Sequence, residues 1–112
     1  METLIHFDGK LVPAGEAKVS VLTHALHYGT SVFEGIRAYA TDRGPAVFRL
    51  REHSVRLLES AKIIGMPVSL SVEQLDQAVI DTINANEQDS AYIRPLLFYG
   101  AKTLGVNPRD NP

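Results

Sequence analysis

The spacing of hydrophobic residues changes twice along the chain, and these two changes limit the fold more than any other feature of the sequence. Short apolar runs separated by turn residues occupy positions 4–50, apolar residues at helical spacing occupy 51–85, and strand-like spacing returns at 91–99. Strands gathered around two adjacent helices are typical of α+β proteins. We therefore expect an α+β fold in which two helices pack on one side of an antiparallel sheet.

Turn residues locate the expected hairpins. An Asp-Gly pair separates two short apolar runs within residues 4–13, which is a strong signal for a tight hairpin. A second hairpin is expected with strands at about 32–40 and 46–50, joined through "TDRGP". After the helices, "SAYIRPLLFYG" predicts another strand, in which Pro95 indicates an edge position or a bulge.

Two helices are expected between these strands. The first ends near Gly65, which is closely followed by Pro67, and its apolar stripe comprises Leu57, Leu58, Ala61 and Ile64. The second begins with Ser71 and Gln74, which fit a capping box. Its apolar face comprises Val72, Leu75, Val79 and Ile83.

Length and composition exclude several classes of protein. The 112 residues are enough for one domain with its own core. A net charge of −2 and an isoelectric point near 6.0 argue against nucleic acid as a partner, and the absence of cysteine excludes a disulfide framework and a thiolate metal site. The N-terminus lacks a basic segment followed by an apolar one, and no apolar run is long enough to span a bilayer. These features predict a soluble, cytoplasmic protein.

Side chains alternate across a β-strand, so "SVFEGIRAY" places two sets of residues on opposite faces. One face carries Phe33, Gly35, Arg37 and Tyr39, and the other carries Val32, Glu34, Ile36 and Ala38. In "AYIRPLLFY" the same rule groups Tyr92, Arg94, Leu96 and Phe98, unless a bulge intervenes. Each strand therefore presents an arginine among aromatic residues on one face.

This pattern is typical of a site for a small carboxylate with an apolar tail. Arginine can hold a carboxylate through two hydrogen bonds, tyrosine can add another, and Gly35 leaves a gap beside Phe33 and Arg37. The alternative is that Arg37 and Arg94 lie on a solvated sheet face and pair with acidic side chains. The residue pattern alone does not decide between these two interpretations.

Four further polar residues can be interpreted from their positions. His24 and His27 are three residues apart, but no third metal ligand is near them in sequence, so we expect structural or hydrogen-bonding roles. Tyr28 precedes a strand and can either enter a pocket or anchor the surface. Arg56 lies away from the apolar helix stripe, and periodicity predicts only a solvated residue.

Three segments, "HALHYGTSVFEGIRAY", "REHSVRLLESAKIIGMPV" and "AYIRPLLFYGAKTLGVNP", together resemble the branched-chain amino-acid aminotransferases. These are class IV, fold type IV enzymes that use pyridoxal 5′-phosphate. The resemblance covers nearly the whole chain in order. "HYGTSVFEGIR" is its most specific part, because D-amino-acid aminotransferases and aminodeoxychorismate lyases typically carry an "FGDG"-type sequence there.

The resemblance implies that residues 1–112 form the smaller, N-terminal domain of a longer enzyme. The turn-rich segment "AKTLGVNPRDNP" is then expected to lie within a loop of that enzyme. The large domain supplies the lysine that holds the cofactor and the glutamate facing its pyridine nitrogen, and neither has a counterpart in this sequence. We therefore expect no catalytic residue here and do not assign that role to Lys102.

The resemblance also implies roles for individual residues. The substrate-binding residues are Tyr28, Phe33, Gly35, Arg37, Tyr92, Arg94, Leu104 and Val106. Within this set, Arg94 is the expected partner of the distal carboxylate of glutamate, and Tyr28 is expected to reach the pocket of a neighbouring subunit. Arg56 is implied to contact the phosphate of the cofactor. No metal site is expected.

The implied reaction is transfer of an amino group between leucine, isoleucine or valine and 2-oxoglutarate. The enzyme is expected to be a homodimer or a larger homo-oligomer, with no nucleic-acid or membrane partner. Two alternatives stay open. One is a sister class IV enzyme that acts on other amino acids, and the other is a free-standing carboxylate-binding or dimerisation module without catalysis.

Overall fold

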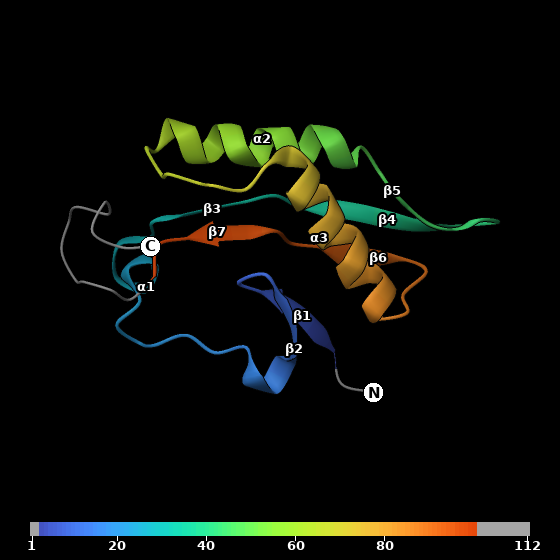
Figure 1. Cartoon of the computed structure of the whole chain (residues 1–112), viewed down its shortest axis with the longest axis horizontal. Helices are drawn as coiled ribbons and strands as arrows, with labels where there is room; N and C mark the ends of the chain where they lie inside the picture. The colour runs from blue at the N-terminus through green and yellow to red at the C-terminus, as the bar shows by residue number, and fades with distance from the viewer. Residues whose placement is uncertain (1–2, 101–112) are drawn as a thin grey trace.

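The computed structural model describes residues 3–100 and confirms the α+β class, with antiparallel strands and the two long helices on one side of the central strands (Figure 1). The elements follow in the order β1 (Leu4–Phe7), β2 (Lys10–Pro13), the 3-10 turn η1 (Ala14–Glu16), α1 (His24–Tyr28), β3 (Ser31–Phe33), β4 (Ile36–Thr41), β5 (Gly44–Val47), α2 (Leu50–Ile63), α3 (Val72–Ala85), β6 (Ala91–Ile93) and β7 (Leu96–Phe98). Within this described range, no helix is long and apolar enough to cross a membrane.

The first hairpin, β1–β2, forms as the Asp-Gly pair predicts. The strands pair antiparallel with Phe7 opposite Lys10, so Asp8 and Gly9 form a two-residue loop. Both loop residues have positive φ, 49° for Asp8 and 85° for Gly9. Two positive φ angles match the backbone twist of the flanking strands, which explains why this dipeptide favours the turn.

The central strands continue through an interruption without changing register. Phe33 lies opposite Leu96 on one side of the interruption and Ile36 lies opposite Ile93 on the other, so neither strand gains a residue. The expected bulge at Pro95 is therefore absent, whereas its expected edge position is confirmed, because β6 and β7 each have one strand neighbour.

The chemistry of proline explains the interruption. The backbone N–H of Glu34 donates to the carbonyl of Pro95 at 3.1 Å. An ordinary residue opposite Glu34 would return a second hydrogen bond, but proline has no N–H. The ladder therefore breaks into β3–β7 and β4–β6 while the side chains keep their alternation.

The loop of the second hairpin is shorter than the sequence predicted. It contains only Asp42 and Arg43, because Thr41 pairs with Gly44. The predicted strand at 46–50 is wrong at both ends, since β5 spans Gly44–Val47 and α2 begins at Leu50. Arg49 has a left-handed backbone, with φ 52°, and this turn redirects the chain from strand to helix.

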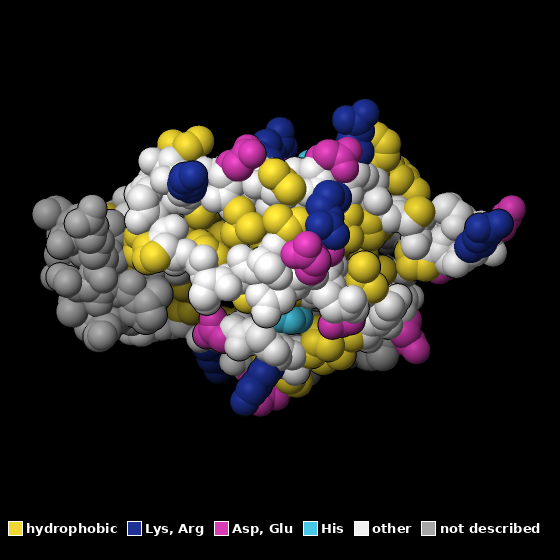
Figure 2. Space-filling view, turned by 45° about the horizontal axis from the view of Figure 1, so that its top comes forward, with side chains coloured by type: hydrophobic (Ala, Val, Ile, Leu, Met, Phe, Trp, Pro, Cys, Tyr) yellow, Lys and Arg dark blue, Asp and Glu magenta, His cyan; other side chains and the backbone are white. Residues whose placement is uncertain are grey.

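Both long helices pack on the same face of the sheet. Helix α2 lies beside β3, and α3 crosses the strands at a steep angle (Figure 1). One core cluster joins β4 to α3 and contains Ile36, Ala38, Val79 and Ile83. A second joins the end of α2 to the strand region and contains Ala61, Met66 and Tyr99. Figure 2 shows further hydrophobic side chains across the middle of the helix-bearing side, bordered by charged ones.

The predicted helix signals are largely confirmed. Ser71 and Gln74 form both hydrogen bonds of the capping box at the start of α3. Gly65, at φ 74°, follows α2 and donates its N–H to the carbonyl of Lys62. The predicted stripe is wrong at Ile64, which is 44% exposed because the helix ends one residue earlier and the chain leaves the helical face.

Ile36→Ala should destabilise the chain by about 2–5 kcal/mol, because it removes a side chain that is 1% exposed between β4 and α3. The matched control is Ile63→Ala, whose side chain is 84% exposed and should cost about 0.5 kcal/mol or less. Urea unfolding followed by circular dichroism measures both free energies. Equal losses in the two variants would contradict this placement of the core.

Candidate functional site

The sheet face opposite the helices carries the aromatic and arginine side chains that alternation grouped together. Phe33 is 53% exposed, whereas its neighbour Glu34 is 5% exposed and Ile36 is 1% exposed. Arg37, Tyr92 and Arg94 are exposed as well. The predicted division of both strands into two faces is therefore confirmed, and it persists through the proline interruption.

Strand register brings the exposed residues into direct contact. Arg37 pairs with Tyr92 across the ladder, and its guanidinium carbon lies 5.6 Å from the centre of the Tyr92 ring. Nη2 of Arg94 donates to the Tyr92 hydroxyl at 2.7 Å, and its guanidinium carbon lies 4.4 Å from the centre of the Phe33 ring. We call Phe33, Gly35, Arg37, Tyr92 and Arg94 the aromatic–arginine cluster.

Gly35 has a clear steric role in this cluster. A Cβ atom built at this position would lie 2.5 Å from the hydroxyl oxygen of Tyr92, which is closer than real Cβ contacts. Any larger residue would therefore push the Tyr92 ring away and strain its hydrogen bond to Arg94. The small residue permits the close approach that glycine in a strand often marks.

The cluster also bears on the two interpretations of its arginines. Within residues 3–100, neither Arg37 nor Arg94 forms an ion pair with an acidic side chain, as the solvated-face interpretation required. Both instead contact aromatic rings, which attract cations through their negative faces. Two guanidinium groups beside an apolar wall can bind a carboxylate with an apolar tail.

Tyr28 lies on α1, and its ring contacts are with histidines. Its ring centre is 4.4 Å from that of His24, which is fully buried and shares a 2.8 Å hydrogen bond between Nδ1 and the Thr30 hydroxyl. Nε2 of His27 lies 2.7 Å from the carbonyl oxygen of Val21. The expected hydrogen-bonding roles of both histidines are confirmed, while the structure does not join Tyr28 to the aromatic–arginine cluster.

A second set of interacting polar side chains, which the sequence did not predict, joins the segment between β3 and β4 to α2. Glu34 accepts hydrogen bonds from Nε of Arg56 at 3.0 Å to each carboxylate oxygen, and from Nη2 at 2.7 Å. Nδ1 of His53 lies 2.7 Å from the same carboxylate. Arg56 is 66% exposed, as periodicity predicted, but it is anchored rather than merely solvated.

This arrangement changes the protonation chemistry of the pair. Hydrogen bonds from Arg56 are the main reason that the pKa of Glu34 lies below its ordinary value of 4.5, and burial acts in the opposite direction. The same hydrogen bonds raise the pKa of Arg56. A glutamate at a position that alternation assigns to the core was the sequence signal for a hidden cationic partner.

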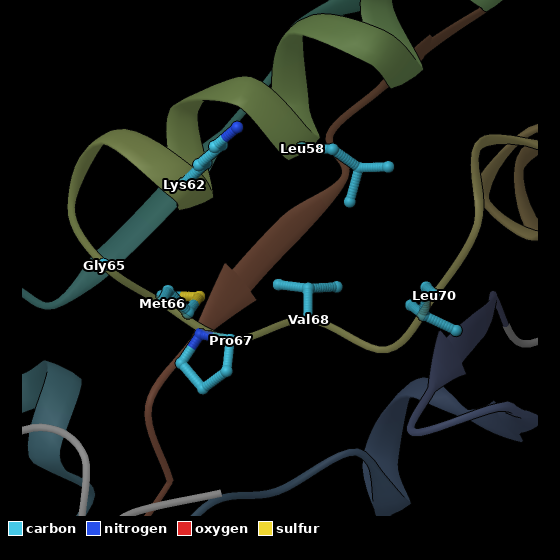
Figure 3. A pocket seen from close by; sticks show the side chains of 7 residues that line it. All are labelled: Leu58, Lys62, Gly65, Met66, Pro67, Val68 and Leu70. Atoms are coloured by element: carbon cyan, nitrogen blue, oxygen red, sulfur yellow. The ribbon is translucent and has the colours of Figure 1, made fainter.

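The described residues do not suggest a metal site. No group of three or more histidine, cysteine, aspartate or glutamate side chains within residues 3–100 could hold a metal ion. An apolar groove near the end of α2 is separate from the aromatic–arginine cluster; Figure 3 shows its lining by Leu58, Lys62, Gly65, Met66, Pro67, Val68 and Leu70. The cation in this lining, Lys62, is exposed.

Comparison with protein families matches residues 31–112 to the model of amino-transferase class IV. The chain belongs to the class IV aminotransferases. The matched region includes the aromatic–arginine cluster as well as Glu34, His53 and Arg56.

The similar proteins and structures found for this class IV aminotransferase chain include several named branched-chain amino-acid aminotransferase. The branched-chain-amino-acid aminotransferase of Escherichia coli K12 is 57% identical over 104 residues, which are 93% of this chain and 34% of that protein. A crystal structure of the T.th. branched-chain amino acid aminotransferase with N-(5′-phosphopyridoxyl)-L-glutamate superimposes with a TM-score of 0.95 at 54% identity, covering 99% of this chain and 38% of that one. The crystal structure of the T.th. enzyme with 4-methylvaleric acid also superimposes with a TM-score of 0.95. The two chains are 55% identical, and the match covers 98% of this chain and 37% of that one.

The aminotransferase chain therefore spans about a third of the length of the relatives it matches. The fold comparison confirms the α+β fold expected for this family. Leu104 and Val106, which the resemblance nominated for substrate binding, and Lys102 lie outside the described residues. The roles assigned to the other residues stay predictions.

The free energy of unfolding of this aminotransferase chain should fall as pH drops below about 4.5, because the unfolded chain binds a proton to Glu34 before the folded chain does. The stabilisation is fully present above the unfolded pKa and is lost as pH falls through the lowered folded pKa. Glu34→Gln and Arg56→Ala should each flatten this part of the profile. Urea unfolding between pH 6 and 3.5 measures it.

The control for this profile is Arg43→Ala, which removes an exposed arginine from the β4–β5 loop and should keep the slope of the unmodified chain. If Glu34→Gln has the same slope as the unmodified chain, the Glu34–Arg56 pair does not contribute to acid unfolding.

Proposed function

We propose that this chain is the N-terminal small domain of a branched-chain amino-acid aminotransferase. The full enzyme transfers the amino group between leucine, isoleucine or valine and 2-oxoglutarate. The observation that carries the proposal is the exposed aromatic–arginine cluster. In it, Arg94 lies over the Phe33 ring, and Tyr92 contacts both arginines and adjoins Gly35. The names of the relatives, at 57% identity for the Escherichia coli enzyme, support the same activity.

The cluster suits a site that must accept two unlike substrates. The branched side chain of leucine needs an apolar surface, which the ring of Phe33 provides. Glutamate needs a cation for its second carboxylate, and Arg94 lies against that same ring. Arg94 also donates to the Tyr92 hydroxyl, so it keeps a hydrogen-bond partner when the apolar substrate occupies the site.

The residues present also fit part of a pyridoxal 5′-phosphate site. Nε and Nη2 of Arg56 are bound to Glu34, and no hydrogen bond within residues 3–100 involves Nη1. This exposed nitrogen can donate to a phosphate oxygen, as arginine does in many phosphate sites. When bound, pyridoxal phosphate supplies the electron sink for the reaction. Phosphopyridoxyl glutamate in the related T.th. enzyme supports this assignment.

In this proposal, residues of this chain have separate roles toward substrate and cofactor. Phe33, Gly35, Arg37, Tyr92 and Arg94 bind and orient the substrate, and Arg56 orients the cofactor. The lysine that holds the cofactor belongs to the large domain of the proposed enzyme. The homo-oligomeric state, the contribution of Tyr28 to a neighbouring pocket and the cytoplasmic location stay predictions.

A sister class IV enzyme and a free-standing binding module remain the alternatives. Substrate profiling of the full-length protein separates the first, because branched-chain amino acids should be preferred. The natural reading frame separates the second, since a gene ending at Pro112 would contradict the proposed enzyme. No specific observation within residues 3–100 favours either alternative over the branched-chain activity.

Full-length protein should bind pyridoxal 5′-phosphate and transaminate leucine with 2-oxoglutarate, whereas residues 1–112 alone should do neither, because the cofactor-holding lysine is outside this chain. Visible absorbance of bound cofactor and coupled glutamate formation measure the two properties. Turnover by the 112-residue chain would contradict the proposed division of labour.

Arg94→Ala in the full-length enzyme should reduce kcat/KM for glutamate at least about tenfold more than for leucine, because a charge-assisted hydrogen bond to the distal carboxylate is lost. The matched control is Arg43→Ala, which removes an exposed arginine from the β4–β5 loop. It should leave kcat/KM unchanged for both substrates. Steady-state kinetics with both amino acids measures the ratio. Equal losses for the two substrates would remove the specific role of Arg94.

A further inference from the structure

Glu34 is a carboxylate in a position that the strand pattern reserves for the core. It lies between Phe33 and Gly35 of the aromatic–arginine cluster, but its side chain points to the opposite, helix-covered face and is 5% exposed. Arg56 and His53, three residues apart on one face of α2, both contact its carboxylate. The buried charge is therefore held from two positions on the helix.

The contacts leave Arg56 with a defined orientation. Its Nε and Nη2 edge is bonded to Glu34 through three contacts of 2.7–3.0 Å, and the remaining nitrogen, Nη1, makes no hydrogen bond within residues 3–100. The side chain is 66% exposed, so without this anchor it would sample many rotamers in solvent. A donor fixed before the ligand arrives loses less entropy on binding.

We propose that Glu34 is a positioning residue, which holds Arg56 so that its free nitrogen faces the phosphate of the cofactor, with His53 also contacting Oε1 of the carboxylate. This inference rests on the proposed function, because that proposal assigns the cofactor phosphate to Arg56. The arrangement is comparable to metal sites in which a carboxylate orients the histidine that binds the metal.

Two energetic arguments favour positioning over a purely structural role. A buried ion pair costs desolvation, and apolar residues of similar size often stabilise a core as well or better. Arg56 is mostly exposed and could remain in water without a partner. An apolar residue at position 34 could therefore stabilise the fold about as well as this pair does. What the pair adds is a fixed direction for the guanidinium.

The negative charge of Glu34 also opposes phosphate binding, and the geometry limits this effect. The carboxylate occupies the Nε–Nη2 edge, so a phosphate at Nη1 would lie on the other side of Cζ. The positive guanidinium would then lie between the two anions and offset part of their repulsion. Orientation is then the larger contribution, and removing Glu34 weakens binding.

The test compares two cofactor forms with the full-length apoenzyme. Glu34→Gln should weaken the affinity for pyridoxal 5′-phosphate about tenfold, and should leave the affinity for pyridoxal, which lacks the phosphate, nearly unchanged. Glu34→Asp keeps the negative charge but shortens the side chain by one methylene. It should therefore also weaken the affinity for pyridoxal 5′-phosphate. Glu52→Gln, an exposed carboxylate on the same helix, is the control. Absorbance or fluorescence titration gives each dissociation constant.

A double-mutant cycle separates action through Arg56 from an independent effect. In an Arg56→Ala background, Glu34→Gln should cause no further loss of pyridoxal 5′-phosphate affinity. Additive losses, equal weakening for pyridoxal, or tighter binding of the phosphate form would each overturn the inference. Thermal unfolding checks that the variants fold. If Glu34→Gln does not fold, Glu34→Asp replaces it in the binding measurements.

The outcomes also distinguish this inference from the proposed function. If the unmodified full-length protein fails to bind pyridoxal 5′-phosphate, the proposed function fails and this inference fails with it. If the unmodified protein binds the cofactor and Glu34→Gln binds it equally well, the positioning role alone is overturned.

Discussion

The antiparallel ladder between residues 31–41 and 91–98 is the constraint on which the rest of the structure depends. Its register is the same on both sides of Pro95, so side chains keep strict alternation although hydrogen bonding is interrupted. A slip of one residue would exchange the two faces. It would bury Arg37 beneath the helices and expose Ile36, and both the core and the aromatic–arginine cluster would be lost.

The two faces of this ladder have different roles that meet at adjacent residues. Ile36 and Ala38 pack against α3 on one face, while Phe33, Arg37 and Arg94 remain available on the other. Glu34 belongs to the helix-covered face but binds Arg56, whose guanidinium extends into solvent. One short strand segment thus connects the aromatic–arginine cluster with the proposed phosphate contact through the backbone between residues 33 and 35.

Local sequence rules predicted several features correctly. The Asp-Gly pair gave the first hairpin, and Ser71 with Gln74 gave the start of α3. The same rules failed at Ile64 and at the β5–α2 boundary, where Arg49 turns the chain with a positive φ. Arginine is a weak signal for that backbone conformation, because a left-handed residue is usually glycine, asparagine or aspartate.

The sequence by itself determined which residues share a face, because strand alternation and helical spacing depend only on neighbours along the chain. It also determined the family, through motifs that a family comparison matches over residues 31–112. Only the tertiary structure decided that Arg94 lies on Phe33 and that Glu34 binds Arg56. These contacts depend on how strands pair and how α2 packs against them, and no local pattern contains the relative position of segments so far apart in the chain.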